Sequence, residues 1–250
     1  MDANTRFVYR ALVLNELRLL TGSEPQERDC LAFASAGDGS AVLAVLDGTA
    51  SLEKLLAFVR GFIDAGGQFA HVIVPNPPPE EVHEYFYVYE FAETICEVSV
   101  LAKATKVKAA TGVAVAPAQK LPDALASGLA DSMACGSGDA KRLLAGSTDA
   151  LTTLEATKDG EAVGASAVFC ADVECRLAGL FTLPDVRGQG VGRALLGRFL
   201  DTAQERGSLL VTSVYPPETE FKFYLARHGF SDVLQWRMYT PPAPDFREGL

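Results

Sequence analysis

The segment from Leu180 to Arg193 constrains the fold of this chain most, because a strand, a glycine-rich turn and a helix follow one another within it. The apolar run through Thr182 is followed by Pro184, which cannot continue strand pairing. Glycines then occupy positions 188, 190 and 192, and residues 192–205 carry apolar side chains at helical spacing. This order predicts a layered fold in which helices pack on a sheet.

The glycine turn also predicts an anion site. Glycine lacks a Cβ, so the main chain can curl tightly and approach a ligand. Amides at a helix N-terminus then converge on one point, where the helix dipole favours a group such as a pyrophosphate. The dinucleotide fingerprint G-x-G-x-x-G fits less well, because counted from Gly188 the third glycine is Gly192, one residue too early. The G-K-[ST] pattern is absent. A purely structural glycine turn is the alternative.

The elements around this turn define the fold class of the second half. We expect strands at 113–116, 151–157, 162–169, 176–183, 209–214 and 233–239, and helices at 121–134, 139–145, 192–205 and 216–228. Asp159-Gly160 supplies a hairpin turn, and Gly229 ends the last helix. The result is an α/β (α+β) fold with a mixed, mostly antiparallel sheet flanked by helices.

The first half looks like a shortened copy, with strands at 30–35, 41–46, 70–74 and 94–102 and helices at 51–65 and 77–89. A shift of 139 residues places Tyr85 on Tyr224 and Phe91 on Phe230. We infer two related halves from a diverged duplication, with coincidence as the alternative. The expected domains are 1–105, 106–241 and a tail at 242–250. A shift of 137 puts other residues at the three glycine positions, so the first copy is expected to be degenerate: Ser51, Glu53 and Leu55.

The charge balance limits the partners. The chain has 22 Lys or Arg against 32 Asp or Glu, a formal charge of −10. A basic footprint for nucleic acid or anionic lipid is absent, so we expect neither partner. Residues 1–105 hold 7 basic and 15 acidic residues, a net of −8, which leaves −2 for residues 106–250. This acid favours cationic substrates such as amines, with solubility as the plainer explanation.

The cysteines and the N-terminus indicate a cellular location. The five cysteines show no zinc spacing and no disulfide framework, so we expect packing cysteines, no metal and a reducing, cytoplasmic compartment. They are Cys30, Cys96, Cys135, Cys170 and Cys175. Charges within the first 20 residues interrupt any signal peptide, and no run of 18 uncharged apolar residues predicts a membrane helix.

The segment 187–192 resembles the signature of the GNAT superfamily of acyltransferases, [Gln/Arg]-x-x-Gly-x-[Gly/Ala]. Pro184, the Asp159-Gly160 hairpin and the closing His228-Gly229-Phe230 agree with it, and the resemblance covers roughly residues 106–241. It implies acetyl-CoA as cosubstrate, with main-chain groups of the strand end holding the pantetheine arm and the loop amides holding the pyrophosphate. The implied binding residues are Leu180, Phe181, Thr182, Arg187, Gly188, Gln189, Gly190, Val191, Gly192 and Arg193.

The resemblance also implies a tyrosine in the last long helix that protonates the leaving thiolate. Counting back from Gly229 places that slot on Leu225, while the chain has Tyr224, one residue or about 100° away. Tyr224 is thus a candidate acid, with core packing as the alternative. Tyr215 is a second candidate donor, against a turn role, and Glu174 a candidate base, against an exposed strand glutamate.

The expected function is an acetyl-CoA:amine N-acetyltransferase acting on a small molecule or a peptide amine. Such chemistry needs a neutral amine, a stabilised oxyanion and a proton for the thiolate. A non-catalytic CoA- or acyl-CoA-binding module is the alternative, and a structural or regulatory partner protein is the third reading. The sequence leaves the acceptor, the acyl chain length and the oligomeric state open.

Overall fold

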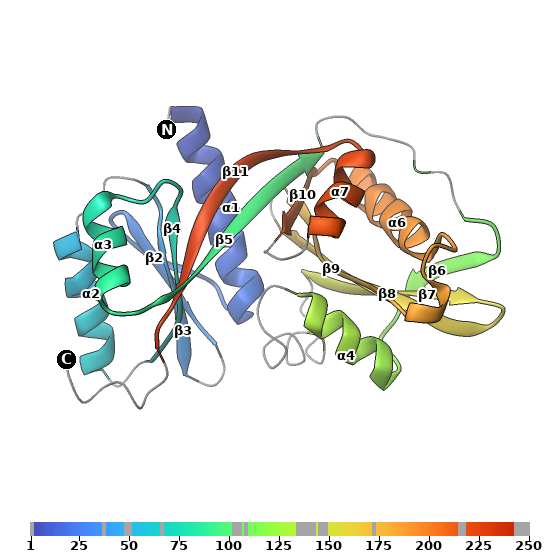
Figure 1. Ribbon diagram of the computed structural model, residues 1–250, viewed down its shortest axis with the longest axis horizontal. Coiled ribbons are helices and arrows are strands. Elements are labelled where there is room, and N and C mark those ends of the chain that lie inside the picture. The colour runs from blue at the N-terminus through green and yellow to red at the C-terminus, as the bar shows by residue number, and fades with distance from the viewer. Residues whose placement is uncertain are drawn as a thin grey trace. The chain divides into compact units, whose positions relative to one another are not determined.

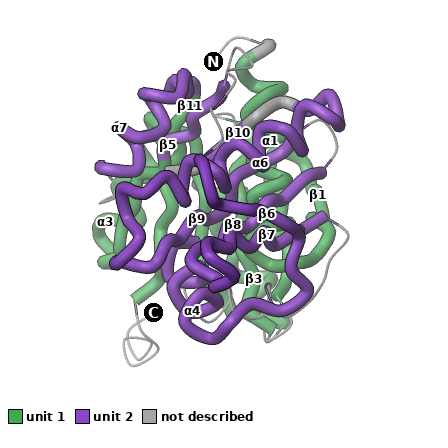
Figure 2. Tube along the Cα trace, turned by 90° about the vertical axis from the view of Figure 1, so that its right-hand side faces the viewer, with its two compact units in different colours: residues 1–96, 234–250 green, residues 97–233 purple. Residues whose placement is uncertain are grey.

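The computed structural model describes residues 3–36, 39–47, 52–65, 68–101, 107, 110–133, 144, 150–171, 174–214 and 219–242. The chain forms two compact units, residues Met1–Cys96 with Leu234–Leu250 and residues Glu97–Val233 (Figure 2). The expected domains ended at residues 105 and 241, whereas residues 97–105 join the second unit and 234–241 join the first.

Unit 1 is a sheet with three helices. Its helices are α1 (Ala3–Thr21), α2 (Leu52–Asp64) and α3 (Glu80–Val88). Its strands are β1 (Gln26–Arg28), β2 (Leu31–Ser35), β3 (Ser40–Val45), β4 (Gln68–Pro75) and parts of β5 (Ala92–Leu101) and β11 (Phe230–Thr240). The strand order is β1-β2-β3-β4-β11, in which only β3 and β4 run parallel.

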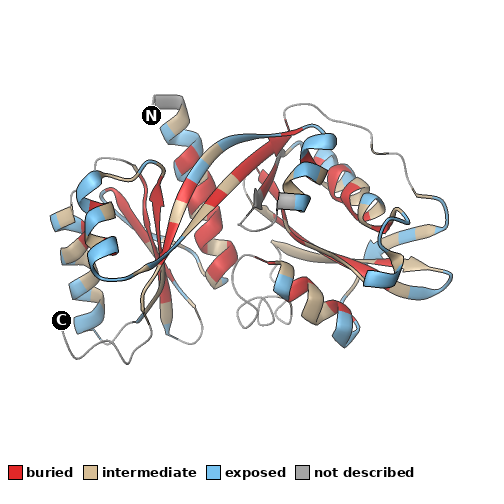
Figure 3. Cartoon of the chain, in the orientation of Figure 1, coloured by how far each residue is buried: buried red, intermediate tan, exposed pale blue. Residues whose placement is uncertain are grey.

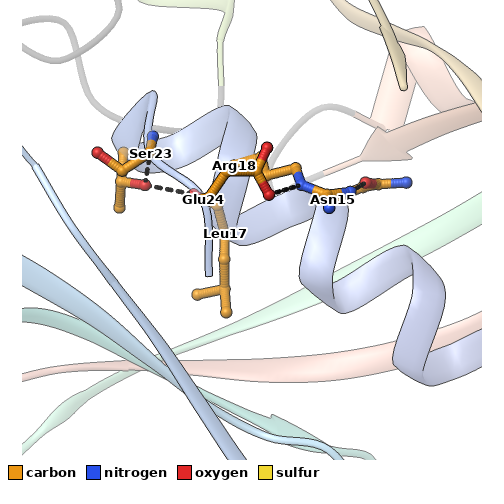
Figure 4. A network of polar contacts seen from close by, with 6 residues as sticks. Asn15, Leu17, Arg18, Ser23 and Glu24 are labelled. Atoms are coloured by element: carbon orange, nitrogen blue, oxygen red, sulfur yellow. Dashed lines mark hydrogen bonds and ion pairs between the residues drawn. The ribbon is translucent and has the colours of Figure 1, made fainter. Parts of the chain in front are cut away.

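Helix α1 was not predicted, although the sequence carried the signal for it. Tyr9, Val13 and Leu17 recur every four residues and are fully buried, and the Tyr9 hydroxyl donates to the Val45 carbonyl at 3.0 Å. Figure 4 shows the end of the helix, where Arg18 donates to the carboxylate of Glu24 at 3.0 Å. Of the charged residues that argued against a signal peptide, Arg6 and Arg10 are exposed in the first half of this helix, whereas Glu16 is buried in its second half.

Unit 2 contains the glycine turn. Its elements are β6 (Val113–Pro117), α4 (Asp123–Ser132), β7 (Leu151–Lys158), β8 (Glu161–Ala171), β9 (Glu174–Thr182), the 3₁₀ turn η1 (Pro184–Val186), α6 (Val191–Arg206), β10 (Leu209–Val214) and α7 (Thr219–Arg227). The strand order is β5-β10-β9-β8-β7-β6, and only β9 and β10 run parallel. The predicted mixed, mostly antiparallel sheet is confirmed. The helix predicted at 139–145 lies outside the described residues, apart from residue 144.

Helices cover both faces of this sheet (Figure 1). On one face, α6 buries six side chains in the main core of the unit, where each buried leucine contributes about 1.5–3 kcal/mol (Figure 3). Those side chains are Val191, Leu195, Leu196, Phe199, Leu200 and Ala203. On the other face lies α4, and Gly179 of β9 leaves room there for Met133 and Leu129. The sheet is thus enclosed near the end of β9.

The two halves repeat the same order of elements. Strands β2 and β3, helix α2, strand β4, helix α3 and strand β5 correspond in order to β8, β9, α6, β10, α7 and β11. Helices α3 and α7 differ by 139 residues at both ends, as the sequence shift predicts. The last strands are exchanged, because β11 pairs with β4 and β5 pairs with β10. This order supports the duplication and explains the unexpected domain boundaries.

The expectation for the cysteines was wrong at one pair. Cys170 and Cys175 form a disulfide, with Cα atoms 4.1 Å apart. They lie directly opposite each other in the antiparallel pair of β8 and β9, the position that brings two side chains closest. The sequence did not reveal this pairing, because it does not show that β8 and β9 pair in the register that places the two cysteines opposite each other. Packing cysteines were the reason to expect a reducing compartment, and the disulfide takes that reason away. Cys30 and Cys96 are buried thiols.

Candidate active site

The loop between β9 and α6 has the conformation that its glycines allow. Gly188 and Gly190 have φ of 78° and 88°, in the left-handed region that favours glycine. Gly190 is also sterically required, since a Cβ there would lie 2.8 Å from the Cβ of Ala110. The chain therefore makes two left-handed turns directly before α6 begins at Val191.

The loop presents main-chain amides at the start of α6. The first helical hydrogen bond runs from Ala194 N to Gly190 O at 3.0 Å, so the amides of Val191, Gly192 and Arg193 have no acceptor within the helix. The cap residue is Gly190, and no side chain caps the helix. Three amides and the positive end of the helix dipole thus converge where the sequence predicts an anion site.

Other loop residues hold the loop in shape. The amide of Gln189 donates to Val186 O at 3.2 Å, and its side-chain amide donates to Asp185 O at 3.0 Å. Lys158, at the end of β7, donates in turn to the side-chain oxygen of Gln189. Gln189 therefore connects the loop to the neighbouring hairpin by hydrogen bonds. The sequence did not reveal this structural role. Arg187 and Arg193 have exposed side chains, and Arg193 Nη2 lies 3.9 Å from the Cβ position of Gly190.

Strand β9 has an open edge beside the loop. Its parallel pairing with β10 ends at Leu177 opposite Thr212, while β9 continues to Thr182 and pairs with β8 along its other edge. Leu183 N bonds Val163 O of β8, so by the alternation along a strand the peptide groups of Leu180 and Thr182 point to the open edge. The two strands therefore diverge at the point where the resemblance implies the pantetheine arm.

Phe181 is arranged differently from its two neighbours. Its carbonyl oxygen lies 3.1 Å from the Cβ position of Gly164 on β8, and its ring lies within 2.6 Å of the Cβ position of Gly128 on α4. Only glycine fits at position 128. Leu180 and Thr182 direct their side chains to Gly192 instead, at 3.6 and 3.9 Å from its Cβ position. Phe181 therefore forms part of the α4 face of the sheet.

Tyr224 approaches the loop, contrary to the register argument from the sequence. Its hydroxyl oxygen lies 4.0 Å from the Cβ position of Gly192, whereas Leu225 is 1% exposed and packs in the core. At the end of α7, His228 N and Gly229 N bond the carbonyls three residues earlier, Leu225 O and Ala226 O. Such 3₁₀ bonds advance the chain by 120° per residue instead of 100°, which moves the slot counted back from Gly229 towards Ala226 and does not account for the position of Tyr224.

The Tyr224 hydroxyl is buried and makes no hydrogen bond with any described residue. Burial raises the pKa of Tyr224 to about 12, although the nearby charge of Arg193 lowers it. The hydroxyl therefore stays protonated across the neutral range and has an unused donor. His228 contacts the last turn of α7, because its Nδ1 lies 2.8 Å from Tyr224 O.

The other catalytic candidates lie elsewhere. Glu174 is 2% exposed, so it is not the exposed strand glutamate of the alternative, and its carboxylate is 3.0 Å from the buried guanidinium of Arg176. It lies at the opposite end of β9 from Leu180 and Thr182. Tyr215 lies outside the described residues. Among the described residues there is no group of His, Cys, Asp and Glu suited to a metal, and no helix with the length and apolarity of a membrane span.

The sequence model of the acetyltransferase (GNAT) domain matches residues 150–232, which include the loop, the open edge and Tyr224. Over residues 150–232, about a third of the chain, the sequence is thus similar to GNAT acetyltransferases. This similarity supports acyl-transfer chemistry of the N-acetyltransferase type.

Solved structures share the fold over nearly the whole chain. A GCN5-related N-acetyltransferase from Kribbella flavida has 15% identity and a TM-score of 0.64, over 94% of this chain and 96% of that one. A tandem GNAT protein from the clavulanic acid biosynthesis pathway has 14% identity and a TM-score of 0.53, over 84% and 77%. A conserved protein of unknown function from Staphylococcus epidermidis has 14% identity and a TM-score of 0.60, over 86% and 92%. No curated protein sequence matches the chain significantly.

Proposed function

We propose that this protein is an acetyl-CoA:amine N-acetyltransferase whose acetyl donor binds between the loop at 187–193 and the open edge of β9. The observation that carries the proposal is the set of three main-chain amides at the start of α6 that have no acceptor within the helix, beside the open edge of β9 and a buried hydroxyl that makes no hydrogen bond with any described residue. Gly192 lies in the first turn of α6, and the Tyr224 hydroxyl lies 4.0 Å from its Cβ position. The amides suit the pyrophosphate, and the hydroxyl suits the sulfur of the thioester.

The reaction needs few groups. The neutral amine attacks the carbonyl carbon of the thioester, the carbon–nitrogen bond forms, the carbon–sulfur bond breaks, and the surplus proton on nitrogen passes to water. Peptide groups of Leu180 and Thr182 at the open edge of β9 orient the donor. The Tyr224 hydroxyl donates a hydrogen bond to the sulfur as its negative charge develops. Amides of Val191, Gly192 and Arg193 hold the pyrophosphate, with the exposed guanidinium of Arg187 at the rim.

The first half is, in this proposal, a copy that has lost its donor site. Its helix α2 begins at Leu52 and carries the buried Leu55 in its first turn. The first turn of α6 in the second half has the small residues Gly192 and Ala194 instead. A fully buried leucine anchors a helix but leaves no room for a close approach of main chain to a ligand. The amine acceptor is proposed from the acidic balance of the chain, most of which lies in residues 1–105.

Calorimetric titration with CoA tests the donor site. Wild-type protein is expected to bind CoA, whereas Gly190→Glu loses binding because the side chain meets Ala110 and its charge opposes the pyrophosphate. Gly160→Glu is the matched control, since Gly160 has a similar φ of 85° with no atom within 4 Å of its Cβ position. Unchanged affinity in a folded Gly190→Glu variant overturns the site. CoA binding without amine-dependent turnover would instead identify a non-catalytic binding module.

A further inference from the structure

A cluster of charged side chains holds the outer side of α7. Lys222 Nζ lies 2.9 Å from a carboxylate oxygen of Asp232 and also donates to Glu97. The second oxygen of Asp232 accepts from the Ser99 hydroxyl at 2.5 Å. Glu97 and Ser99 lie on β5 and Asp232 on β11, so one ammonium group joins α7 to two strands. The carboxylates lie close to the points where those strands pass between the units.

The electrostatics of this cluster are favourable. Hydrogen bonds to Glu97 and then Asp232 raise the pKa of Lys222 above its ordinary value, outweighing burial. Burial would raise the pKa of Asp232, but the hydrogen bonds from Ser99 and Lys222 and the charge of Lys222 bring it below its ordinary value. Lys222 and Asp232 are therefore charged together throughout the neutral range. Since Lys222, Glu97 and Asp232 are 25–37% exposed, solvent limits their contribution to stability.

The positions on α7 connect this cluster with Tyr224. Residues advance by about 100° around a helix, so Tyr224 lies about 100° to one side of Leu225 and Lys222 about 60° to the other. Leu225 points into the core and acts as a pivot. The Tyr224 ring contacts His228, at 4.5 Å between ring centroids, and Phe221, and both Phe221 and Tyr224 also pack against the core cluster of the unit. The polar pairs of Lys222 on the outer side of α7 act together with this apolar packing on the rotation of the helix.

We propose that Lys222 is a positioning residue, whose pairs with Glu97 and Asp232 fix the rotation of α7 and so hold the Tyr224 hydroxyl beside the start of α6. The inference rests on the proposed function, in which that hydroxyl donates to the sulfur. A rotation of about 20° moves an atom 8 Å from the helix axis by ~3 Å. A movement of that size breaks a hydrogen bond.

Turnover of acetyl-CoA with an amine tests this role. Lys222→Met removes the charge and keeps the length, Lys222→Arg restores the charge, and Arg198→Met breaks a comparable exposed pair within α6, Arg198 with Glu205 at 3.5 Å. We expect Lys222→Met to lose about tenfold in kcat with KM for acetyl-CoA within about twofold. Lys222→Arg is expected to recover most of the loss, and Arg198→Met to show none. In a Tyr224→Phe background, Lys222→Met should cost nothing further, because both changes remove the same contact.

The proposal is overturned if Lys222→Met loses as much kcat in the Tyr224→Phe background as in the wild type, or if it loses none in the wild-type background. A second readout separates this failure from failure of the proposed function. Fluorotyrosine placed at position 224 reports the surroundings of the ring by ¹⁹F NMR, whether or not the protein turns over acetyl-CoA. The resonance should shift in Lys222→Met, return in Lys222→Arg and stay in place in Arg198→Met. An unchanged resonance in Lys222→Met rejects the positioning role even if acetyl transfer is established, and a shifted one supports it even if turnover is absent.

Discussion

Replacing Tyr224 with phenylalanine removes only the hydroxyl group, and we expect this change to affect kcat and the melting temperature differently. A phenol with a pKa of about 12 is about 3.5 units weaker as an acid than a thiol of pKa 8.5, so complete proton transfer to the thiolate would cost ~5 kcal/mol. We therefore expect Tyr224 to act by donating a hydrogen bond to the developing charge. Such bonds contribute about 1.5–3 kcal/mol, which corresponds to a loss of roughly 10–150-fold in kcat.

Stability should respond in the opposite sense. The hydroxyl is buried without a partner among the described residues, so removing it relieves a desolvation cost. The melting temperature of Tyr224→Phe should be equal to or above that of the wild type, with CoA affinity unchanged. The pKa is raised in the folded state, so wild-type stability from this group is complete below about pH 10 and is lost as the pH rises towards 12. Below pH 9 the two proteins should therefore show parallel stability profiles.

Release of free thiol from acetyl-CoA in the presence of an amine measures kcat, and thermal melting and CoA titration measure the rest. Activity within twofold of the wild type would refute the role given to the hydroxyl. A melting temperature several degrees lower would show that the hydroxyl has a structural partner, and the loss of activity would then need another cause.

Three further outcomes follow from the same structure. Gly190→Ala should destabilise the fold by about 1–3 kcal/mol in denaturant unfolding and weaken CoA binding, because strain and a contact with Ala110 add, whereas Gly160→Ala should show only the backbone strain of ~1 kcal/mol and normal binding. CoA should bind once per chain in calorimetry, and two equivalent sites would contradict a degenerate first half. A fragment of residues 106–241 should fail to give a cooperative melt, because it lacks the β5 residues that pair with β10, whereas a fragment that folds and binds CoA would show that the strand exchange is dispensable.

The region around the glycine loop could be predicted from the sequence because its signals are local. Helix α6 begins at Val191, one residue before the predicted start. The prediction was this close because the glycines and the apolar spacing determine the backbone conformation of residues only a few positions away. The strand exchange could not be predicted, because the apolar patterns of β5 and β11 suit pairing with either β4 or β10. Pairing partners of that kind are decided by tertiary packing.

The catalytic candidates depended on finer geometry. The Tyr224 hydroxyl lies 4.0 Å from the Cβ position of Gly192, and this approach depends on the tertiary packing of α7, which a count of residues along the helix does not contain. Glu174 was predicted from its place on a strand, but its pairing with Arg176 depends on burial that no local pattern signals. Helix α1 was not predicted, although Tyr9, Val13 and Leu17 recur at helical spacing, because the charged residues of this segment were used only to exclude a signal peptide.

The central claim is amine-dependent acetyl transfer at the loop of residues 187–193. Its most direct test incubates the full chain with acetyl-CoA and a panel of primary amines and follows free CoA thiol together with the mass of each amine. The account predicts that thiol release requires an amine, that the amine gains one acetyl group for each thiol released, and that Gly190→Glu abolishes both while Gly160→Glu retains them. Thiol release that is unchanged by Gly190→Glu, or bound CoA with no acetylated amine in the panel, would contradict it.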